Sequence, residues 1–132
     1  MKFSFKNDYS EGCHPKILEA LSQYNLDQQN GYGLDIYSEN AANIIREKSK
    51  SSESKVHLVS GGTQANLIVI SSILRPHESV VSANTGHIFT NETGAIEATG
   101  HKVHGVETKD GKLRPEDIQK VLDVHTNVPH QL

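Results

Sequence analysis

The chain has 132 residues, a length that favours a single domain. Its 13 Lys and Arg residues stand against 16 Asp and Glu residues, and the net charge of -3 argues against a nucleic-acid-binding protein, which usually carries a basic stripe. No apolar stretch approaches the ~20 residues that cross a bilayer, the N-terminus is too polar for a signal peptide, and the single cysteine fits a reducing compartment. We therefore expect a cytoplasmic protein that binds neither nucleic acid nor a membrane.

Two helices are predicted in the N-terminal third of the chain. Apolar residues recur at helical spacing over residues 15–24, and Pro15 suits the first position of a helix. A second helix is predicted through Ile44 and Ile45, with Ser38 as the residue that caps its N-terminus. A short polar loop separates this helix from the next apolar run.

A strand, a glycine turn and a third helix are predicted next. Residues 55–59 form a short, apolar, β-branched run that is typical of a buried strand. The apolar residues within 63–74 indicate a helix that stops before Pro76. The sequence SGGTQAN, residues 60–66, therefore marks a turn from a strand into a helix.

The C-terminal half continues the alternation of strands and helices. Strands are predicted at residues 79–82 and 101–106, a short helix at 91–99 that stops at Gly100, and a last helix over about residues 115–123. Such alternation implies right-handed crossovers and a mostly parallel sheet. The predicted fold class is α/β.

The predicted sheet is small for a complete α/β domain. Only three strands are expected, whereas a parallel sheet needs helices on both faces, and residues 127–132 stand where a further strand would follow. We therefore expect residues 1–132 to be the N-terminal portion of a larger domain that continues beyond Leu132. The alternative is a compact three-layer domain with an irregular C-terminus.

The glycine turn is suited to binding an anion. Ligands of parallel sheets bind outside the carboxyl ends of the strands, and Gly61 and Gly62 stand at such an end. Glycine permits positive φ and a close approach of the backbone to a ligand, while the helix that follows offers unpaired N–H groups and Thr63 adds a hydroxyl donor. The stretch matches neither the dinucleotide nor the nucleoside-triphosphate motif, so a ligand with one phosphate is expected. The alternative is a tight turn whose glycines only satisfy the backbone geometry.

His87 is the candidate for chemistry at the same edge of the sheet. It follows the strand predicted at residues 79–82, and an imidazole there could stack on a planar ligand or transfer a proton. The alternative is a structural histidine, since the chain has eight histidines. His101 and His104 are not expected to bind a metal together, because their spacing on a strand points them to opposite faces. No metal site is predicted.

Four motifs together resemble a known family. SGGTQAN, the pattern H-x-x-x-x-E-x-G at residues 87–94 and DGKLRPEDI at residues 110–118 occur in that order, and YGLD stands at residues 32–35. From Phe5 onward the chain resembles the N-terminal part of the threonine aldolase and β-eliminating lyase family. These are pyridoxal-phosphate enzymes of the aspartate-aminotransferase fold. The resemblance implies a three-layer, mostly parallel sheet of the pyridoxal-phosphate transferase type, incomplete in this chain.

The resemblance also implies a cofactor site. Gly61, Gly62 and Thr63 are expected to hold the phosphate of pyridoxal 5'-phosphate, and the ring of His87 is expected to stack on the pyridine ring. In family members a Schiff-base lysine and an aspartate that pairs with the pyridine nitrogen lie further along than Leu132. Residues 1–132 alone are therefore expected to be inactive.

Two further residues are implied to lie near the substrate. Family members often have a serine that contacts the substrate carboxylate, and Asn7 stands in its place here. An asparagine can still donate a hydrogen bond to a carboxylate. Tyr32 and its loop are expected near an active site, either their own or that of a neighbouring subunit, because the resemblance implies a homo-oligomer, either a dimer or a tetramer.

The expected function is that of a lyase. The full-length protein would cleave a β-hydroxy amino acid such as threonine to glycine and an aldehyde, with the cofactor stabilising the charge left at Cα and His87 as the candidate base for the hydroxyl proton. One alternative is a pyridoxal-phosphate-dependent β-elimination on another amino acid. The other is a non-catalytic α/β module that binds a phosphate compound or serves as an interaction domain.

Overall fold

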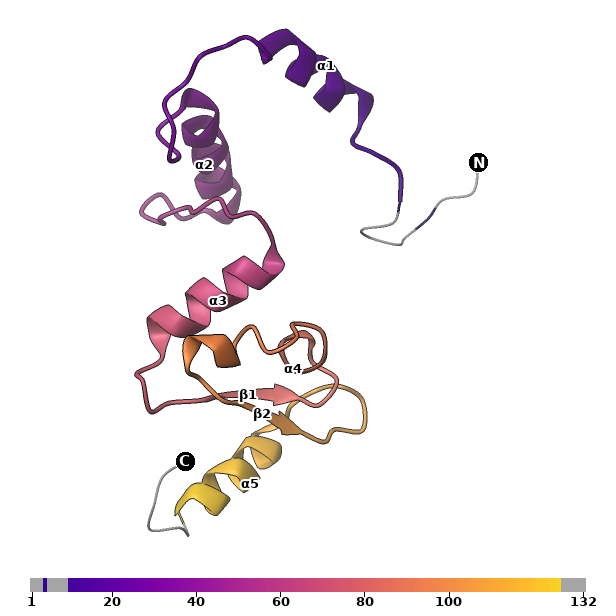
Figure 1. The fold of residues 1–132 in the computed structure, drawn as a ribbon, viewed down its shortest axis with the longest axis vertical. Coiled ribbons are helices and arrows are strands. Elements are labelled where there is room, and N and C mark those ends of the chain that lie inside the picture. The colour runs from indigo at the N-terminus through magenta and orange to yellow at the C-terminus, as the bar shows by residue number, and fades with distance from the viewer. Residues whose placement is uncertain (1–3, 5–9, 127–132) are drawn as a thin grey trace. The chain divides into compact units, whose positions relative to one another are not determined.

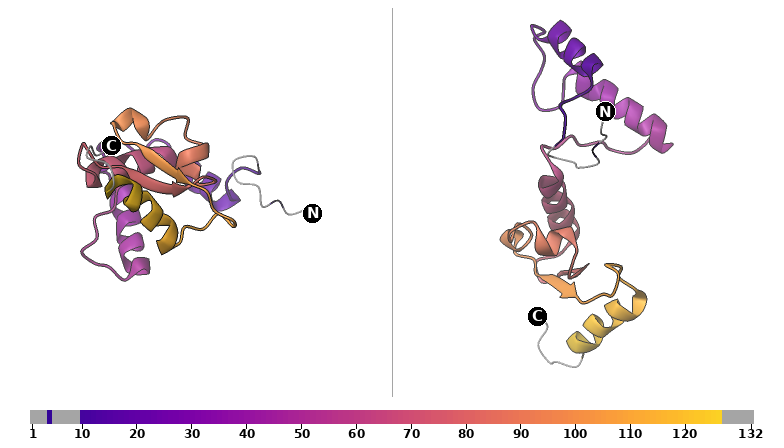
Figure 2. Two further views of the ribbon diagram at one scale, coloured as in Figure 1. Left: turned by 90° about the horizontal axis from the view of Figure 1, so that it is seen from below. Right: turned by 90° about the vertical axis from the view of Figure 1, so that its right-hand side faces the viewer.

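The computed structural model describes residue 4 and residues 10–126 (Figures 1 and 2). The chain divides into two compact units, Met1–Leu58 and Val59–Leu132, and each is described by itself. Within the described part of the chain, no helix is long and apolar enough to cross a membrane.

The first unit holds two helices, α1 (Pro15–Tyr24) and α2 (Ile36–Ser49). α1 has the predicted bounds, and the Nδ1 atom of His14 accepts a hydrogen bond from a backbone N–H group in its first turn. The aromatic rings of Tyr24 and Tyr37 lie 5.3 Å apart between their centroids. This contact joins the end of α1 to the start of α2.

The N-terminal cap of α2 differs from the prediction. Asp35, and not Ser38, precedes the helix, and its carboxylate accepts hydrogen bonds from both the backbone N–H and the hydroxyl of Ser38, each at 2.7 Å. The carboxylate caps well because its oxygens accept both bonds and its negative charge suits the positive end of the helix dipole. The hydrogen bond from the Ser38 hydroxyl, followed by that from its N–H, lowers the pKa of Asp35.

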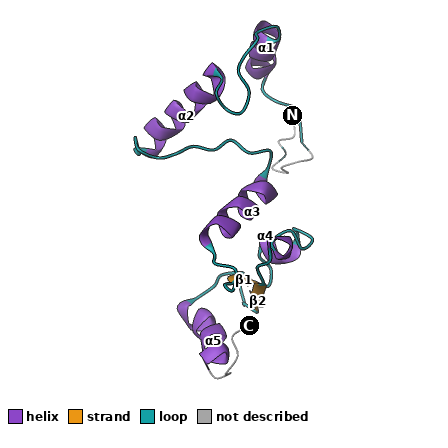
Figure 3. Ribbon diagram, turned by 60° about the vertical axis from the view of Figure 1, so that its left-hand side comes forward, coloured by secondary structure: helices purple, strands orange, loops and turns teal. Residues whose placement is uncertain are grey.

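The second unit is an α/β arrangement around a two-stranded parallel sheet. Its elements are α3 (Gly62–Ile73), β1 (Val80–Ala83), α4 (His87–Thr90), the 3-10 turn η1 (Glu97–Thr99), β2 (Val103–Val106) and α5 (Pro115–Thr126). The strands, drawn orange in Figure 3, pair in parallel with Val80 opposite Val103. α4 and α5 lie on opposite sides of the strand pair (Figures 1 and 2). The α/β class and the parallel pairing are as predicted.

The buried core of this unit includes residues of both strands and of the segment that leads into η1. Ile96 is fully buried, and Val103 and Ala83 are 6% and 7% exposed. Phe89 of α4 lies so close to Gly105 of β2 that a Cβ atom on this glycine would overlap the aromatic ring. The glycine therefore allows α4 to contact the backbone of β2 directly.

The strand predicted at residues 55–59 is not formed. This segment is irregular, and Leu58 and Val59 are 59% and 40% exposed. A strand needs a neighbour to satisfy its backbone hydrogen bonds, and no strand of the described residues pairs with this segment. The apolar, β-branched composition predicted a buried strand, but this segment is largely exposed because composition cannot supply the partner strand.

The single helix predicted at residues 91–99 is also wrong. α4 comes earlier in the chain, and only the short turn η1 occupies the end of the predicted range. Between them Thr93 and Gly94 have φ angles of 51° and 81°, a left-handed conformation that a right-handed helix cannot contain. Gly100 stops the segment as predicted, with a φ angle of 91°.

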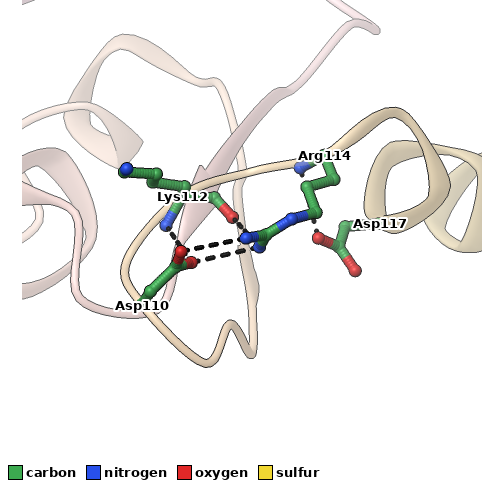
Figure 4. Close-up of polar contacts among 4 residues, drawn as sticks. All are labelled: Asp110, Lys112, Arg114 and Asp117. Atoms are coloured by element: carbon green, nitrogen blue, oxygen red, sulfur yellow. Dashed lines mark hydrogen bonds and ion pairs between the residues drawn. The ribbon is translucent and has the colours of Figure 1, made fainter.

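The loop before α5 is held by polar contacts within the DGKLRPEDI motif (Figure 4). The two carboxylate oxygens of Asp110 accept hydrogen bonds from the guanidinium of Arg114 at 3.1 and 2.9 Å. The backbone N–H of Arg114 donates to the Asp117 carboxylate at 3.2 Å, so a side chain of the first turn caps the helix from within. This motif therefore has a structural explanation as the start of α5.

Candidate functional site

The glycine turn leads into α3, as predicted, and the helix begins at Gly62, one residue earlier than expected. The side chain of Gln64 bends back over the turn, and its Oε1 atom accepts hydrogen bonds from the N–H and the hydroxyl of Ser60, both at 2.8 Å. The first hydrogen bond of the helix runs from the N–H of Ala65 to the carbonyl of Gly61 at 3.1 Å.

Three backbone donors remain at this end of the helix. No side chain caps α3, and no acceptor among residues 10–126 contacts the N–H groups of Gly62, Thr63 or Gln64. These donors lie at the positive end of a helix of 12 residues. The turn thus has the geometry with which helix N-termini bind anions.

The two glycines of the turn are not required by the described structure. Gly61 is extended, with a φ angle of 178°, and neither it nor Gly62 has a positive φ angle. A Cβ atom added to either glycine would meet no atom of the described residues within 4 Å. The interpretation that these glycines only satisfy a tight turn is therefore not supported. What they still provide is a bare backbone that a ligand can approach closely.

His87 is the first residue of α4 and follows the carboxyl end of β1, as the sequence predicted. Gly86 makes the turn between them: its N–H donates to the carbonyl of Ala83 at 2.8 Å. A Cβ atom on Gly86 would overlap the Ser82 hydroxyl and lie 3.0 Å from the Ala83 oxygen. The side chain of His87 is 63% exposed. The structure therefore presents this imidazole at the surface of the unit.

A buried carboxylate lies behind His87. Glu92, in the loop after α4, has a fully buried side chain, and its Oε1 atom lies 3.5 Å from the Nε2 atom of His87. The same oxygen accepts a hydrogen bond of 2.6 Å from the Nδ2 atom of Asn66, on α3. Glu92 therefore connects the helix that follows the glycine turn to the histidine at the start of α4.

The second oxygen of Glu92, Oε2, is buried and has no hydrogen-bond partner in the described part of the chain. An unsatisfied buried polar group costs about 1–3 kcal/mol, and more when it is charged. Such groups are rare in folded proteins and are often found at functional sites. This carboxylate lies beside the candidate catalytic histidine.

The sequence reasoning did not select Glu92 or Asn66 as site residues. Both nevertheless belong to the motifs that carried the resemblance, since Asn66 ends SGGTQAN and Glu92 is the acidic residue of H-x-x-x-x-E-x-G. Their contact joins positions that are 26 residues apart, so no local pattern could reveal it. The signal was the presence of two polar residues at fixed places beside the predicted phosphate and histidine residues.

The remaining candidate residues lie outside this cluster. Tyr32 belongs to the first unit, where it is fully exposed with a φ angle of 62°. It lines an open pocket of about 830 Å³ together with residues that include Arg46 and His57. Asn7 lies outside the described residues. In the described ranges, no three His, Cys, Asp or Glu side chains are grouped as metal ligands would be.

The comparison with protein families agrees with the resemblance that the motifs indicated. The sequence model of the beta-eliminating lyase family matches residues 8–132. The chain belongs to this family.

Individual relatives are threonine aldolases. The chain is 30% identical over 131 residues to a low specificity L-threonine aldolase of Pseudomonas sp., and the match covers 95% of this chain and 38% of that protein. A low specificity L-threonine aldolase of Pseudomonas aeruginosa is 28% identical over the same shares of the two chains. The solved structure of Leishmania major threonine aldolase matches with a TM-score of 0.89 and 48% identity, covering 99% of this chain and 38% of that chain. The chain thus spans well under half the length of these relatives.

Proposed function

We propose that residues 1–132 are the N-terminal part of a pyridoxal-phosphate-dependent lyase that cleaves a β-hydroxy amino acid such as threonine into glycine and an aldehyde. The observation that carries this proposal is the bare N-terminus of α3, linked through Asn66 and Glu92 to His87. The similarity to threonine aldolases over most of the chain supports the choice of reaction.

The residues of the glycine turn fit the phosphate of pyridoxal 5'-phosphate. The N–H groups of Gly62 and Thr63 and the Thr63 hydroxyl are donors, and Gly61 and Gly62 leave the space that a Cβ would fill. The helix dipole contributes roughly 0.3–1 kcal/mol to such binding when the anion is exposed. When bound, this cofactor supplies the electron sink that stabilises the negative charge left at Cα.

His87 has two roles in the proposal. Its exposed ring, at the first position of α4, can stack on the planar pyridine ring. One of its nitrogens accepts the proton of the substrate hydroxyl, which allows the Cα–Cβ bond to break as the aldehyde carbonyl forms. Tyr32 and Asn7 are proposed to contact the substrate.

The rest of the active site is proposed to lie in the part of the relatives' length that this chain does not span. We place there the lysine that binds the cofactor, the aspartate that pairs with its ring nitrogen, and further strands of a three-layer sheet. One of these strands would pair with residues 55–59. A homo-oligomer, a dimer or a tetramer, and a cytoplasmic location that suits the exposed thiol of Cys13 complete the proposal.

The test is to express the full-length protein encoded by the continuous reading frame and incubate it with threonine. Release of glycine and acetaldehyde in equal amounts, dependent on added pyridoxal 5'-phosphate, is the expected result. Release of ammonia and a keto acid from another amino acid would favour β-elimination. A natural stop codon directly after Leu132, with no cleavage activity, would favour a non-catalytic module. Residues 1–132 alone are expected to release no acetaldehyde above a control without protein.

A further inference from the structure

Three elements of the second unit meet at one oxygen atom. Asn66 comes from α3, His87 from the start of α4, and Glu92 from the loop that follows α4. The Oε1 atom of Glu92 lies 2.6 Å from the Asn66 Nδ2 atom and 3.5 Å from the His87 Nε2 atom. Glu92 is buried, while the imidazole is largely exposed.

This oxygen decides which nitrogen of the imidazole carries the hydrogen. Because Oε1 accepts the hydrogen bond from Asn66, it is an acceptor, and the nitrogen that faces it is stable there only as a donor. A neutral imidazole has one N–H and one acceptor nitrogen, so Nδ1 of His87 becomes the acceptor. The 3.5 Å separation is long for a hydrogen bond, and such contacts in free enzymes commonly shorten when a ligand is bound.

We propose that Glu92 is a positioning residue of the proposed active site: it holds His87 in the tautomer with hydrogen on Nε2, so that Nδ1 accepts the substrate proton. This inference rests on the proposed function for the identity of the substrate. The O–H bond of the substrate breaks and its proton moves to Nδ1. The oxygen electrons form the aldehyde carbonyl as the Cα–Cβ bond breaks, and the pair left on Cα takes up a proton to give glycine.

The environment of Glu92 distinguishes this role from a structural one. A structural carboxylate in a protein interior normally uses both oxygens, whereas the buried Oε2 atom has no hydrogen-bond partner within residues 10–126. A carboxylate held behind a histidine also stabilises the imidazolium that forms when the ring accepts a proton, as in catalytic triads. The arrangement therefore favours proton acceptance over packing.

The first experiment reads the tautomer directly in the full-length protein without cofactor. Long-range proton–nitrogen NMR spectra of the protein with ¹⁵N-labelled histidine identify the protonated nitrogen, and His87→Phe assigns the signals. We expect the Nε2–H form in the parent. Glu92→Met removes the acceptor and should give a mixture of tautomers, whereas Glu92→Gln keeps an amide oxygen and should retain the Nε2–H form. Glu97→Met removes an exposed carboxylate five residues further along the chain and should change nothing.

The second experiment measures threonine cleavage by the same variants loaded with cofactor. Glu92→Met should lower kcat roughly tenfold to a hundredfold with little change in KM, which is less than the roughly 10²- to 10⁴-fold contribution of a general base because the base itself, His87, remains. Glu92→Gln should recover part of this loss. If Glu92→Met fails to fold, the spectrum of the parent protein alone tests the proposed tautomer, because a parent with hydrogen on Nδ1 of His87 overturns the inference.

The two proposals fail in different ways. If the parent shows the Nε2–H form but neither binds pyridoxal 5'-phosphate nor cleaves threonine, the proposed function is wrong and the contact between Glu92 and His87 stands. If the parent cleaves threonine and Glu92→Met changes neither the tautomer nor kcat, the proposed function stands and the role of Glu92 is wrong.

Discussion

Two pairs of glycines near the candidate site have opposite surroundings. A Cβ atom on Gly86 or Gly105 would overlap neighbouring side chains, whereas a Cβ atom on Gly61 or Gly62 would meet nothing within 4 Å among the residues that the structure describes. The first pair is explained by packing around the two strands. The second pair is explained by nothing in the described structure, and a bare backbone is what a phosphate ligand requires. Glycines that cannot be told apart in the sequence thus have different structural roles.

The largest effect is expected where the glycine is packed. Gly86→Ala places a methyl group against the buried Ser82 side chain and the Ala83 carbonyl. Overpacking of this kind costs about 1–3 kcal/mol, and the free energy of unfolding of the full-length protein in denaturant measures the loss. The matched control is Gly12→Ala, because a Cβ atom there meets nothing within 4 Å in the described part of the chain. Equal stability of the two variants would remove the distinction between packed and open glycines.

The open glycine should respond in the opposite direction. Gly62→Ala introduces a better helix former at the first position of α3 without a clash, so the protein without cofactor should gain about 0.4–1 kcal/mol of stability. The same methyl group stands where the phosphate is proposed to approach. We expect pyridoxal 5'-phosphate to bind about tenfold more weakly, a change of about 1.4 kcal/mol. Equilibrium titration of the full-length protein with the cofactor measures it, and unchanged affinity would show that the ligand does not contact this turn.

Local rules predicted much of the fold from the sequence. Pro15 and Pro115 begin α1 and α5, and Gly100 ends η1, because the preferences of proline and glycine act within a few residues. The strand at residues 55–59 was predicted wrongly because pairing depends on a distant partner. The cap of α2 was misplaced because Asp35 and Ser38 are both suitable capping residues, and only their contact shows which one precedes the helix.

Only those parts of the candidate site that depend on local patterns were predicted from the sequence. The turn into α3 and the place of His87 after β1 follow from local patterns. The burial of Glu92 does not, because it results from the packing of α3 beside the loop after α4. Long-range contacts between polar residues are therefore what the structure adds.

At the contact between β2 and α5, His104 provides a pH-dependent test. It lies on β2 with its ring 5.0 Å from that of His125 on α5. Burial, with smaller effects of Lys102 and His125, lowers the pKa of His104 below its ordinary value of 6.5. The unfolded chain therefore binds the proton more readily, so stability is fully present above pH 6.5 and is lost as the pH falls through the lowered pKa.

Replacing His104 with phenylalanine should reduce this pH dependence. The ring still packs against His125 but no longer titrates, so the midpoint of denaturant unfolding should fall less between neutral and mildly acid pH than in the parent. His77→Phe is the control for the substitution itself, since His77 is exposed and is not part of the ring contact with His125. If His104→Phe has the parental slope, the contact between β2 and α5 does not carry the acid sensitivity.

The smallest effect is expected at the exposed loop before α5. Asp110→Asn removes the charge that pairs with Arg114, but the side chains of Arg114 and Asp110 are 52% and 43% exposed, so water and salt weaken the pair. The hydrogen bonds from Arg114 lower the pKa of Asp110 below 3.8, so the contribution is present above pH 3.8 and is lost in stronger acid. Thermal unfolding should show a small loss at neutral pH that shrinks in high salt and in acid. A loss as large as that of Gly86→Ala would show that this loop contributes as much to the free energy of unfolding as the packed turn at Gly86. The Asp117 cap and the ion pair would then stabilise the start of α5 together.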